Sequence, residues 1–132
     1  MEISTVNYLG HLRTECIHHS GEKILTDAPK DNFGKGEAFS PTDLMATSLA
    51  ACFITIMGIY CQQNGIIMEH CTAKVEKIMS ALPRKIAQIN IRFNLTDNHW
   101  DKATFNAVVS AGKKCPVGLT IEAVVAIDYI LE

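Results

Sequence analysis

An uncharged, strongly apolar stretch at Leu44–Cys61 constrains the fold of this chain more than any other feature. By its length the stretch reaches the lower limit for a membrane-spanning helix. No lysine or arginine flanks it closely, although basic flanks favour orientation in a membrane. It also holds small or polar residues, namely Thr47, Ser48, Thr55 and Gly58. We therefore expect a buried core helix and no membrane span.

The residues on either side of this stretch are typical of helix ends. Ser40 suits the N-cap, Pro41 suits the first helical position, and Asp43 favours the positive end of the helix dipole. Asn64 and Gly65 follow the stretch as a stop signal. The sequence therefore predicts one long helix between Ser40 and Asn64.

Strands are predicted on both sides of the long helix. Ser20 and Gly21 mark a turn between short strands within residues 5–27. The loop that follows, DAPKDNFGKGEAFSP, is rich in proline, glycine and charge, and loops of this length are often functional. Residues 88–95 alternate between polar and apolar side chains, which indicates an antiparallel strand with one solvated face.

Two more helices and a last strand complete the chain. Asp97 or Asn98 can cap a helix that continues to about Ala111. A short helical turn then begins at Cys115, and residues 123–131 return as the final strand. The predicted order is βββ-α-ββ-αα-β, which is an α+β fold.

The composition fits a single domain over residues 1–132, because 48% hydrophobic and 20% charged residues are ordinary for a globular protein. A domain of this size buries only about two-thirds of the surface of its unfolded chain. A second subunit can therefore shield part of the apolar helix. The composition alone does not decide between a monomer and a homodimer.

The charge pattern disfavours nucleic acid as a partner. The net charge is −2, and the longest basic run is the pair Lys113-Lys114, whereas phosphate binding needs a concentrated basic surface. The first residues have neither the basic end nor the apolar run of a signal peptide. We expect a cytoplasmic protein that binds neither nucleic acid nor membrane.

The chain has five cysteines, an odd number that argues against a disulfide-stapled extracellular protein. No two of them form a C-x-x-C pair, and no histidine pair completes a zinc spacing. We therefore predict free thiols and no metal cofactor. Cys16, Cys61 and Cys71 lie in predicted strands or at the end of the long helix, and we interpret all three as structural.

Cys52 and Cys115 are the candidates for chemistry. Cys52 lies in the middle of the apolar helix, where a cysteine is most often a small buried hydrophobe. Cys115 precedes Pro116 at a helix start and follows Lys113 and Lys114. Unpaired backbone N–H groups, the helix dipole and nearby ammonium groups all lower a thiol pKa, so we predict a reactive thiol at Cys115.

Two motifs together resemble a known family. FSPTDLMATSLAACF, followed some sixty positions later by KKCPVGLT, is similar to the OsmC/Ohr family, which has a proline-led helix start, a cysteine about eleven positions further on, and a distant Cys-Pro-Val. The predicted order of elements agrees over nearly the whole chain. The resemblance implies an OsmC-like fold in which antiparallel sheets wrap long central helices in an intertwined homodimer.

The resemblance also implies an enzyme of oxidative-stress defence, a cysteine-based reductase of organic hydroperoxides. In that reaction Cys52 would be oxidised to a sulfenic acid, Cys115 would resolve it as a disulfide, and a dithiol would reduce the disulfide. Neither a metal nor an organic cofactor is required, since sulfur supplies both the nucleophile and the electrons.

The family's arginine, which stabilises the thiolate, corresponds to Arg13, the only arginine in the N-terminal strands. Peroxidase members carry glutamate after the helix-starting proline, where this chain has Thr42. Asp43 is then a candidate to orient Arg13, with Glu37 approaching from another direction. This departure places the chain nearer the less characterised OsmC-like branch. The alternatives are a redox-sensing or small-ligand-binding dimer with slow turnover, and a structural protein with inert thiols.

Overall fold

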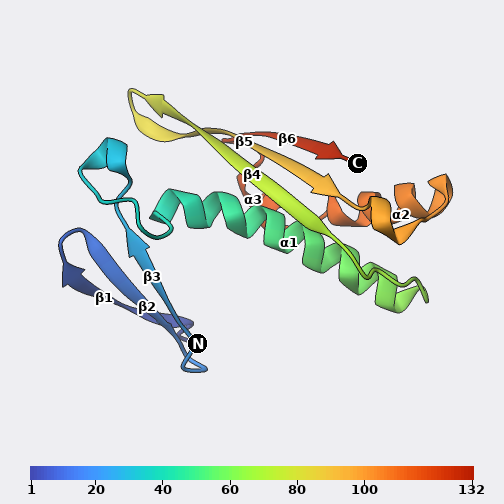
Figure 1. Cartoon of the computed structure of the whole chain (residues 1–132), viewed down its shortest axis with the longest axis horizontal. Helices are drawn as coiled ribbons and strands as arrows, with labels where there is room; N and C mark the ends of the chain where they lie inside the picture. Colours follow the sequence, from blue (N-terminus) through green and yellow to red (C-terminus); the bar gives the residue numbers. More distant parts are fainter. The chain divides into compact units, whose positions relative to one another are not determined.

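The computed structural model describes all 132 residues and has two compact units, Met1–Met45 and Ala46–Glu132. The order of elements confirms the predicted α+β fold (Figure 1). The bounds are β1 Ser4–Gly10, β2 Arg13–His18, β3 Lys23–Asp27, α1 Pro41–Gln63, β4 Thr72–Ala81, β5 Arg84–Asn94, α2 Lys102–Gly112, α3 Pro116–Ile121 and β6 Ala126–Leu131. Short 3-10 turns lie at Lys30–Asn32 and Thr96–Asn98.

The first unit is an antiparallel sheet in the order β1-β2-β3. Cys16 on β2 pairs with Val6 on one side and Ile24 on the other, which confirms that it lies in a strand. The predicted turn after β2 is present, and Gly21 adopts the left-handed backbone that a tight turn needs, with φ of 99°.

Both ends of α1 form as predicted. The Ser40 side-chain oxygen accepts a hydrogen bond from the Asp43 amide at 3.0 Å, and the Asp43 carboxylate accepts one from the Ser40 amide at 2.9 Å, which is a reciprocal capping box. At the other end Gly65 has φ of 64°, and the Ile66 amide donates to the Cys61 carbonyl. This closure stops the helix at the predicted place.

One face of α1 is buried in the core of the second unit. The buried residues follow helical spacing: Ala46, Leu49, Ala50, Phe53, Met57 and Cys61. The helix is long and apolar enough to cross a membrane by length and composition alone, and 33% of its most apolar window is buried within the chain. The buried face identifies a core helix, whereas burial of the remaining face by a second subunit stays a prediction.

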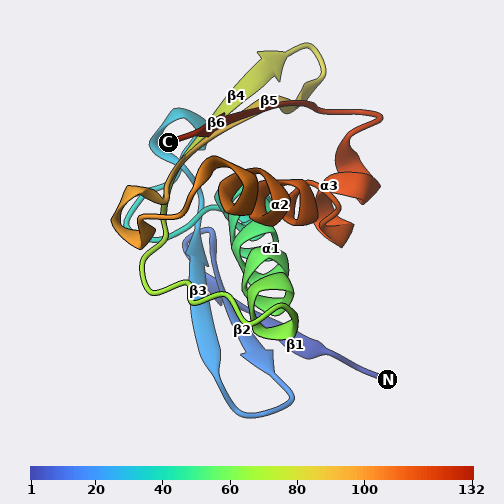
Figure 2. The same ribbon diagram turned by 90° about the vertical axis from the view of Figure 1, so that its right-hand side faces the viewer.

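The second unit packs its helices on one side of a three-stranded sheet, as Figures 1 and 2 show. The predicted alternation in β5 is confirmed, because Ile89, Ile91 and Phe93 are fully buried. β4 pairs with β5 in antiparallel orientation, but β6 pairs with β5 in parallel. The expectation of purely antiparallel sheets is therefore wrong at this pair, since a crossover through α2 and α3 returns the chain in the same direction.

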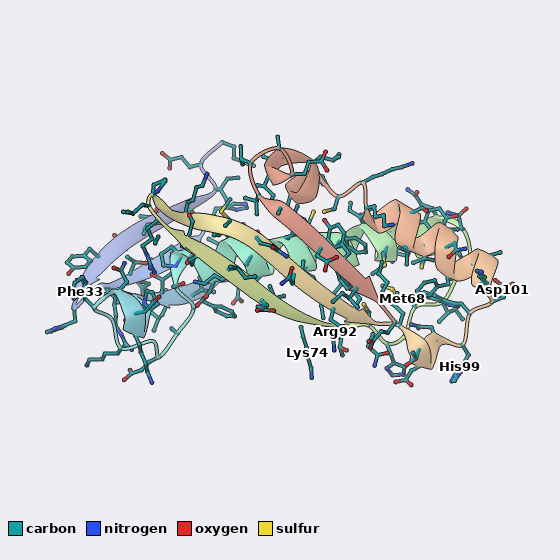
Figure 3. The ribbon with its side chains drawn as sticks, turned by 90° about the horizontal axis from the view of Figure 1, so that it is seen from above. Phe33, Met68, Lys74, Arg92, His99 and Asp101 are labelled. Atoms are coloured by element: carbon teal, nitrogen blue, oxygen red, sulfur yellow. The ribbon has the colours of Figure 1, made fainter.

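The predicted start of α2 was too early. The N-cap is Asp101, whose carboxylate accepts a hydrogen bond from the Thr104 amide at 2.7 Å (Figure 3). Asn98 instead accepts from the Glu69 amide and donates to the His70 carbonyl, so its side chain secures the loop before β4. The last strand likewise begins at Ala126, because residues 123–125 belong to the turn that ends α3.

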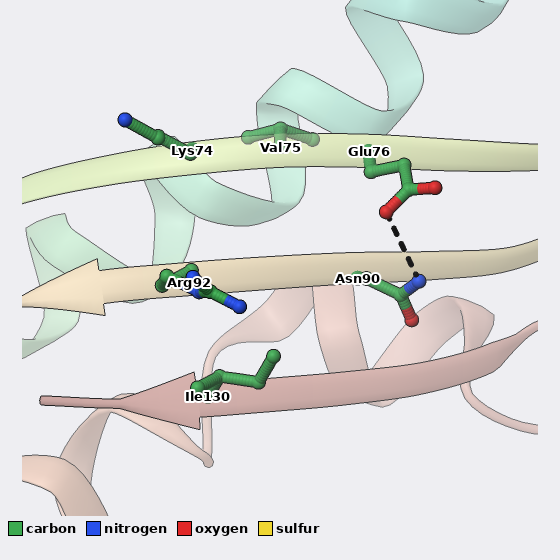
Figure 4. A pocket seen from close by; sticks show the side chains of 6 residues that line it. All are labelled: Lys74, Val75, Glu76, Asn90, Arg92 and Ile130. Carbon is green, nitrogen blue, oxygen red and sulfur yellow. Dashed lines mark hydrogen bonds between the residues drawn. The ribbon is translucent and has the colours of Figure 1, made fainter.

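The outer face of the second sheet is polar. A hollow of about 190 Å³ there is lined by Lys74, Val75, Glu76, Asn90, Arg92 and Ile130, shown in Figure 4. The Asn90 amide donates to the Glu76 carboxylate at 3.5 Å. No thiol lines this hollow, so the candidate chemistry lies elsewhere.

Candidate active site

The structure brings Cys52 and Cys115 together within the second unit. Their side chains lie close enough that the Cys52 thiol raises the pKa of the Cys115 thiol, although the two residues come from α1 and from the start of α3. Cys52 is partly exposed, whereas Cys115 is completely buried. Both are free thiols. A thiol that solvent can reach thus stands beside one that solvent cannot reach.

Cys115 is the N-cap of α3, as the sequence predicted. Its sulfur accepts a hydrogen bond from the Gly118 amide at 3.3 Å, and Pro116 occupies the first turn, where no amide hydrogen is needed. The Leu119 amide donates to the Cys115 carbonyl at 3.0 Å and closes the first turn. Local sequence therefore fixes the position of this sulfur.

The pKa of the Cys115 thiol is raised, which contradicts the predicted lowering. Burial is the largest cause, and the neighbouring Cys52 thiol acts in the same direction. The amides of Gly118 and Val117 do lower the pKa, as the helix start implied, but burial outweighs them. Cys115 is therefore protonated at rest.

Tyr129 interacts with both thiols and was not singled out from the sequence. Burial raises its pKa to about 12, and the charges of Cys115, Glu122 and Cys52 contribute in the same direction. The signal was present in the alternation of β6, where Tyr129 pairs with the buried Ile91 and so faces the core. The parallel register that places it there was not predictable locally.

Arg13 lies at the start of β2 in the first unit, paired with two carboxylates. Its Nη2 atom lies 2.6 Å from Glu37 Oε2 and 3.4 Å from Asp27 Oδ2. Asp43, the predicted partner, caps α1 through its bond with the Ser40 amide. The carboxylates that the structure places on the guanidinium are thus Asp27 and Glu37.

Asp27 was also missed by the sequence reasoning. Its side chain is fully buried, its Oδ2 atom accepts from the Glu37 amide at 3.0 Å, and its Oδ1 atom has no hydrogen-bond partner. The Glu37 amide and Arg13 lower the pKa of the Asp27 carboxyl. Asp27 therefore stays ionised and ties the arginine to the loop after β3.

The remaining cysteines belong to other parts of the chain. Cys61 is buried at the end of α1, Cys71 is partly buried before β4, and burial raises the pKa of both thiols. Cys16 is in β2. No group of three or more histidine, cysteine or acidic side chains is placed to hold a metal ion.

Comparison with known proteins agrees with the motifs. The family model described as OsmC-like protein matches residues 34–129. The chain belongs to this family. A crystal structure of a protein from Psychrobacter arcticus, named for osmotic stress induction and a detoxification response, is 42% identical with a TM-score of 0.93, and the match covers 100% of this chain and 96% of that one.

More distant structures share the OsmC-like fold. An organic hydroperoxide resistance protein OsmC from Legionella pneumophila is 20% identical with a TM-score of 0.78, covering 100% of this chain and 96% of that one. The organic hydroperoxide resistance protein OhrB of Bacillus subtilis is 18% identical with a TM-score of 0.68, covering 98% and 97%. A comparison with curated proteins found no match.

Proposed function

We propose that this OsmC-like protein is a cysteine-based hydroperoxide reductase with a role in peroxide resistance. The Cys52 thiolate attacks the peroxide, the O–O bond breaks, and the alcohol leaves after taking a proton. Cys52 is then a sulfenic acid. The Cys115 sulfur displaces its oxygen as water, and a disulfide forms between the two residues. An external dithiol reduces this disulfide and restores both thiols.

The interaction between the neighbouring thiols of Cys52 and Cys115 is the observation that carries this proposal. A sulfenic acid with a second thiol beside it condenses quickly and escapes over-oxidation. Partial exposure gives a peroxide access to Cys52, while burial keeps Cys115 protonated until it is needed. The unequal exposure of the two thiols therefore matches their unequal roles.

The names of related structures support the same class of substrate. The Legionella and Bacillus proteins are both named for organic hydroperoxide resistance. Because the reaction uses sulfur alone, we propose no metal and no organic cofactor. The chain then acts as one domain over residues 1–132, in the cytoplasm, where dithiol reductants are available.

Arg13 and a second subunit complete the proposed site. A guanidinium near a sulfur favours the thiolate, and its fixed charge does not titrate. Asp27 and Glu37 are proposed to hold Arg13 in place of the glutamate that Thr42 replaces. We propose that the working form is a homodimer, since the family resemblance implies sites at a subunit interface.

A redox-sensing or ligand-binding dimer is the second candidate function. Thr42 favours it, because the carboxylate that peroxidase members place directly after the proline is absent here. The same thiol pair would then oxidise slowly and report peroxide or hold a thiol-reactive ligand. Turnover rate separates the two candidates.

The test is peroxide consumption with dithiothreitol as the reductant. Wild type should turn over cumene hydroperoxide many times, and Cys52→Ser should lose this activity completely. Cys61→Ser is the matched control, because Cys61 lies on the same helix and is not in the pair. A wild-type rate equal to that of Cys52→Ser would reject the reductase, while a single rapid oxidation without turnover would favour the sensor.

A further inference from the structure

We propose that Tyr129 on β6 is a positioning residue for disulfide formation, because its hydroxyl and the Cys115 sulfur both lie beside Gly118. The proposal rests on the reductase function above and deepens it. It assigns a task to a polar group that the thiol chemistry alone does not need. A phenylalanine would fill the same space, so the hydroxyl is the feature that requires an explanation.

The position of the hydroxyl follows from the glycine beside it. A Cβ atom on Gly118 would stand 3.1 Å from the Tyr129 hydroxyl and 3.2 Å from the Cys115 sulfur. The two polar atoms therefore converge on the small space that the missing side chain leaves open. Gly118 also donates its amide hydrogen to the same sulfur at 3.3 Å, which holds the sulfur at the start of α3.

Aromatic packing fixes the direction of the phenol. The ring of Tyr129 lies 4.8 Å from that of Phe53 and 6.3 Å from that of Phe93, and those two rings stack on each other at 4.4 Å. Phe53 and Phe93 are fully buried. Because a packed core holds its side chains in fixed rotamers, the hydroxyl stays in its place beside Gly118.

The hydroxyl is suited to the state in which Cys115 is charged. In disulfide formation Cys115 gives up its proton, its sulfur bonds to that of Cys52, and the S–O bond of the sulfenic acid breaks; the departing hydroxide takes the proton and leaves as water. Burial disfavours the charged sulfur. With its raised pKa, Tyr129 stays neutral and can only donate a hydrogen bond to that charge.

Tyr129→Phe tests this role because it keeps the ring and removes the hydroxyl. Peroxide attack at Cys52 is monitored after addition of one equivalent of cumene hydroperoxide. The rate of this step should equal that of wild type. Disulfide formation should slow by about ten-fold, the effect of losing one hydrogen bond to a charged group. The rate of this step should also rise only at higher pH than in wild type, and excess peroxide should convert more Cys52 to sulfinic acid.

Tyr60→Phe is the matched control, since Tyr60 lies on the same helix as Cys52 and is not part of the proposed site. A Tyr129→Phe protein that forms the disulfide at the wild-type rate, with an unchanged pH profile, would overturn the proposal. If wild type itself forms no disulfide, the reductase function fails instead, so the two failures are distinguishable.

A second measurement covers the case in which Tyr129→Phe does not fold. Fluorotyrosine keeps the shape of the phenol and makes it a stronger donor. Incorporated on a background of Tyr8→Phe and Tyr60→Phe, it changes Tyr129 alone. Disulfide formation should then be faster than in the same background with ordinary tyrosine, and an equal rate would overturn the proposal.

Discussion

Gly112, the last residue of α2, lies directly against the ring of Phe53 on α1. A Cβ atom at this glycine would stand 2.6 Å from Phe53 Cδ1 and 2.9 Å from Met57 Cγ, which is closer than real atoms approach. The two helices therefore pack through a position that only glycine fits. This contact fixes the end of α2, and with it the short link to Cys115.

Gly112→Ala should accordingly destabilise the protein by about 1–3 kcal/mol, the usual effect of overpacking a core. Gly58→Ala on α1 is the matched control, since its Cβ would meet only Met68 Cε at an ordinary 3.6 Å. That change should stabilise the helix by about 0.5–1 kcal/mol. Thermal unfolding of both variants measures the difference in stability. Equal shifts of the unfolding temperature in the same direction would contradict the proposed packing role of Gly112.

Arg13 variants test the proposed support of the Cys52 thiolate. Arg13→Ala should slow peroxide consumption at pH 7, because loss of the cation disfavours the charged sulfur. Arg13→Lys keeps the charge but loses the planar fork, so a partial recovery would assign the effect to charge. The rate at which iodoacetamide alkylates Cys52 measures the thiolate fraction of this residue without peroxide.

The carboxylates that contact Arg13 are the basis of a second prediction. Glu37→Gln should slow peroxide attack in wild type yet add little to Arg13→Ala, because residues that act as one unit are not additive. Asp43→Asn, which alters the cap of α1, should behave differently and lower stability on either background. If Glu37→Gln slows the reaction equally on both backgrounds, Glu37 does not act through Arg13.

Local signals explain what the sequence predicted correctly. The start of α1 follows from the Ser40 and Asp43 cap, and the buried face of β5 follows from its alternation. Cys115 caps α3 because Pro116 follows it. In each case the determining residues lie within a few positions of one another, so no tertiary information was required.

The features that the sequence did not predict depend on strand register and on burial. Arg13 stands opposite Asp27 only in one pairing of β2 with β3, and a slip of one residue would send Asp27 to the other face. Tyr129 comes to lie beside Gly118 through the parallel pairing of β6 with β5, which follows a crossover through two helices. The raised pKa of Cys115 arises from burial in the assembled core, which a helix-start motif does not report.

Stability should fall in alkaline solution because of the buried thiols. Burial raises the pKa of Cys61 and Cys115 above the ordinary 9.0, so the folded protein keeps protons that the unfolded chain releases. Their contribution is complete below pH 9 and is lost as the pH rises toward the folded pKa values. Each thiol adds a slope of at most about 1.4 kcal/mol per pH unit.

Urea unfolding between pH 7 and pH 10 measures this slope. Cys61→Ala removes one of the groups and should reduce the decline. A stability that is constant over this range in wild type would mean that the thiols ionise alike in both states.

Cys115→Ser separates the two steps of the proposed reaction. The first oxidation of Cys52 should proceed, because Cys115 does not contact the peroxide in that step. The sulfenic acid should then persist and react with dimedone, and repeated exposure to peroxide should inactivate the protein by over-oxidation. Mass spectrometry identifies the adduct. A Cys115→Ser protein with wild-type turnover would exclude Cys115 as the resolving thiol.

The homodimer is predicted from the apolar helix and the family resemblance, and the first unit has an exposed apolar surface that fits this prediction. Val6 on β1 and Ile24 on β3 flank Cys16 on one sheet face, and they are 60% and 48% exposed in the single chain. Tyr8, two positions after Val6, is 68% exposed. A sheet face with this much apolar surface is a typical interaction surface, and α1 also leaves Ile59 44% exposed.

Sedimentation velocity should therefore show a dimer at micromolar concentration. Ile24→Asp should shift the protein toward monomer, because a buried unpaired carboxylate strongly disfavours an interface. Val124→Asp is the control, since Val124 is 72% exposed in the turn before β6 and does not lie on this sheet. Loss of peroxide consumption in the monomeric Ile24→Asp protein, with the control unaffected, would tie activity to the dimer. A monomeric wild-type protein would contradict the dimer prediction, because the apolar face of the first sheet would then remain exposed to water.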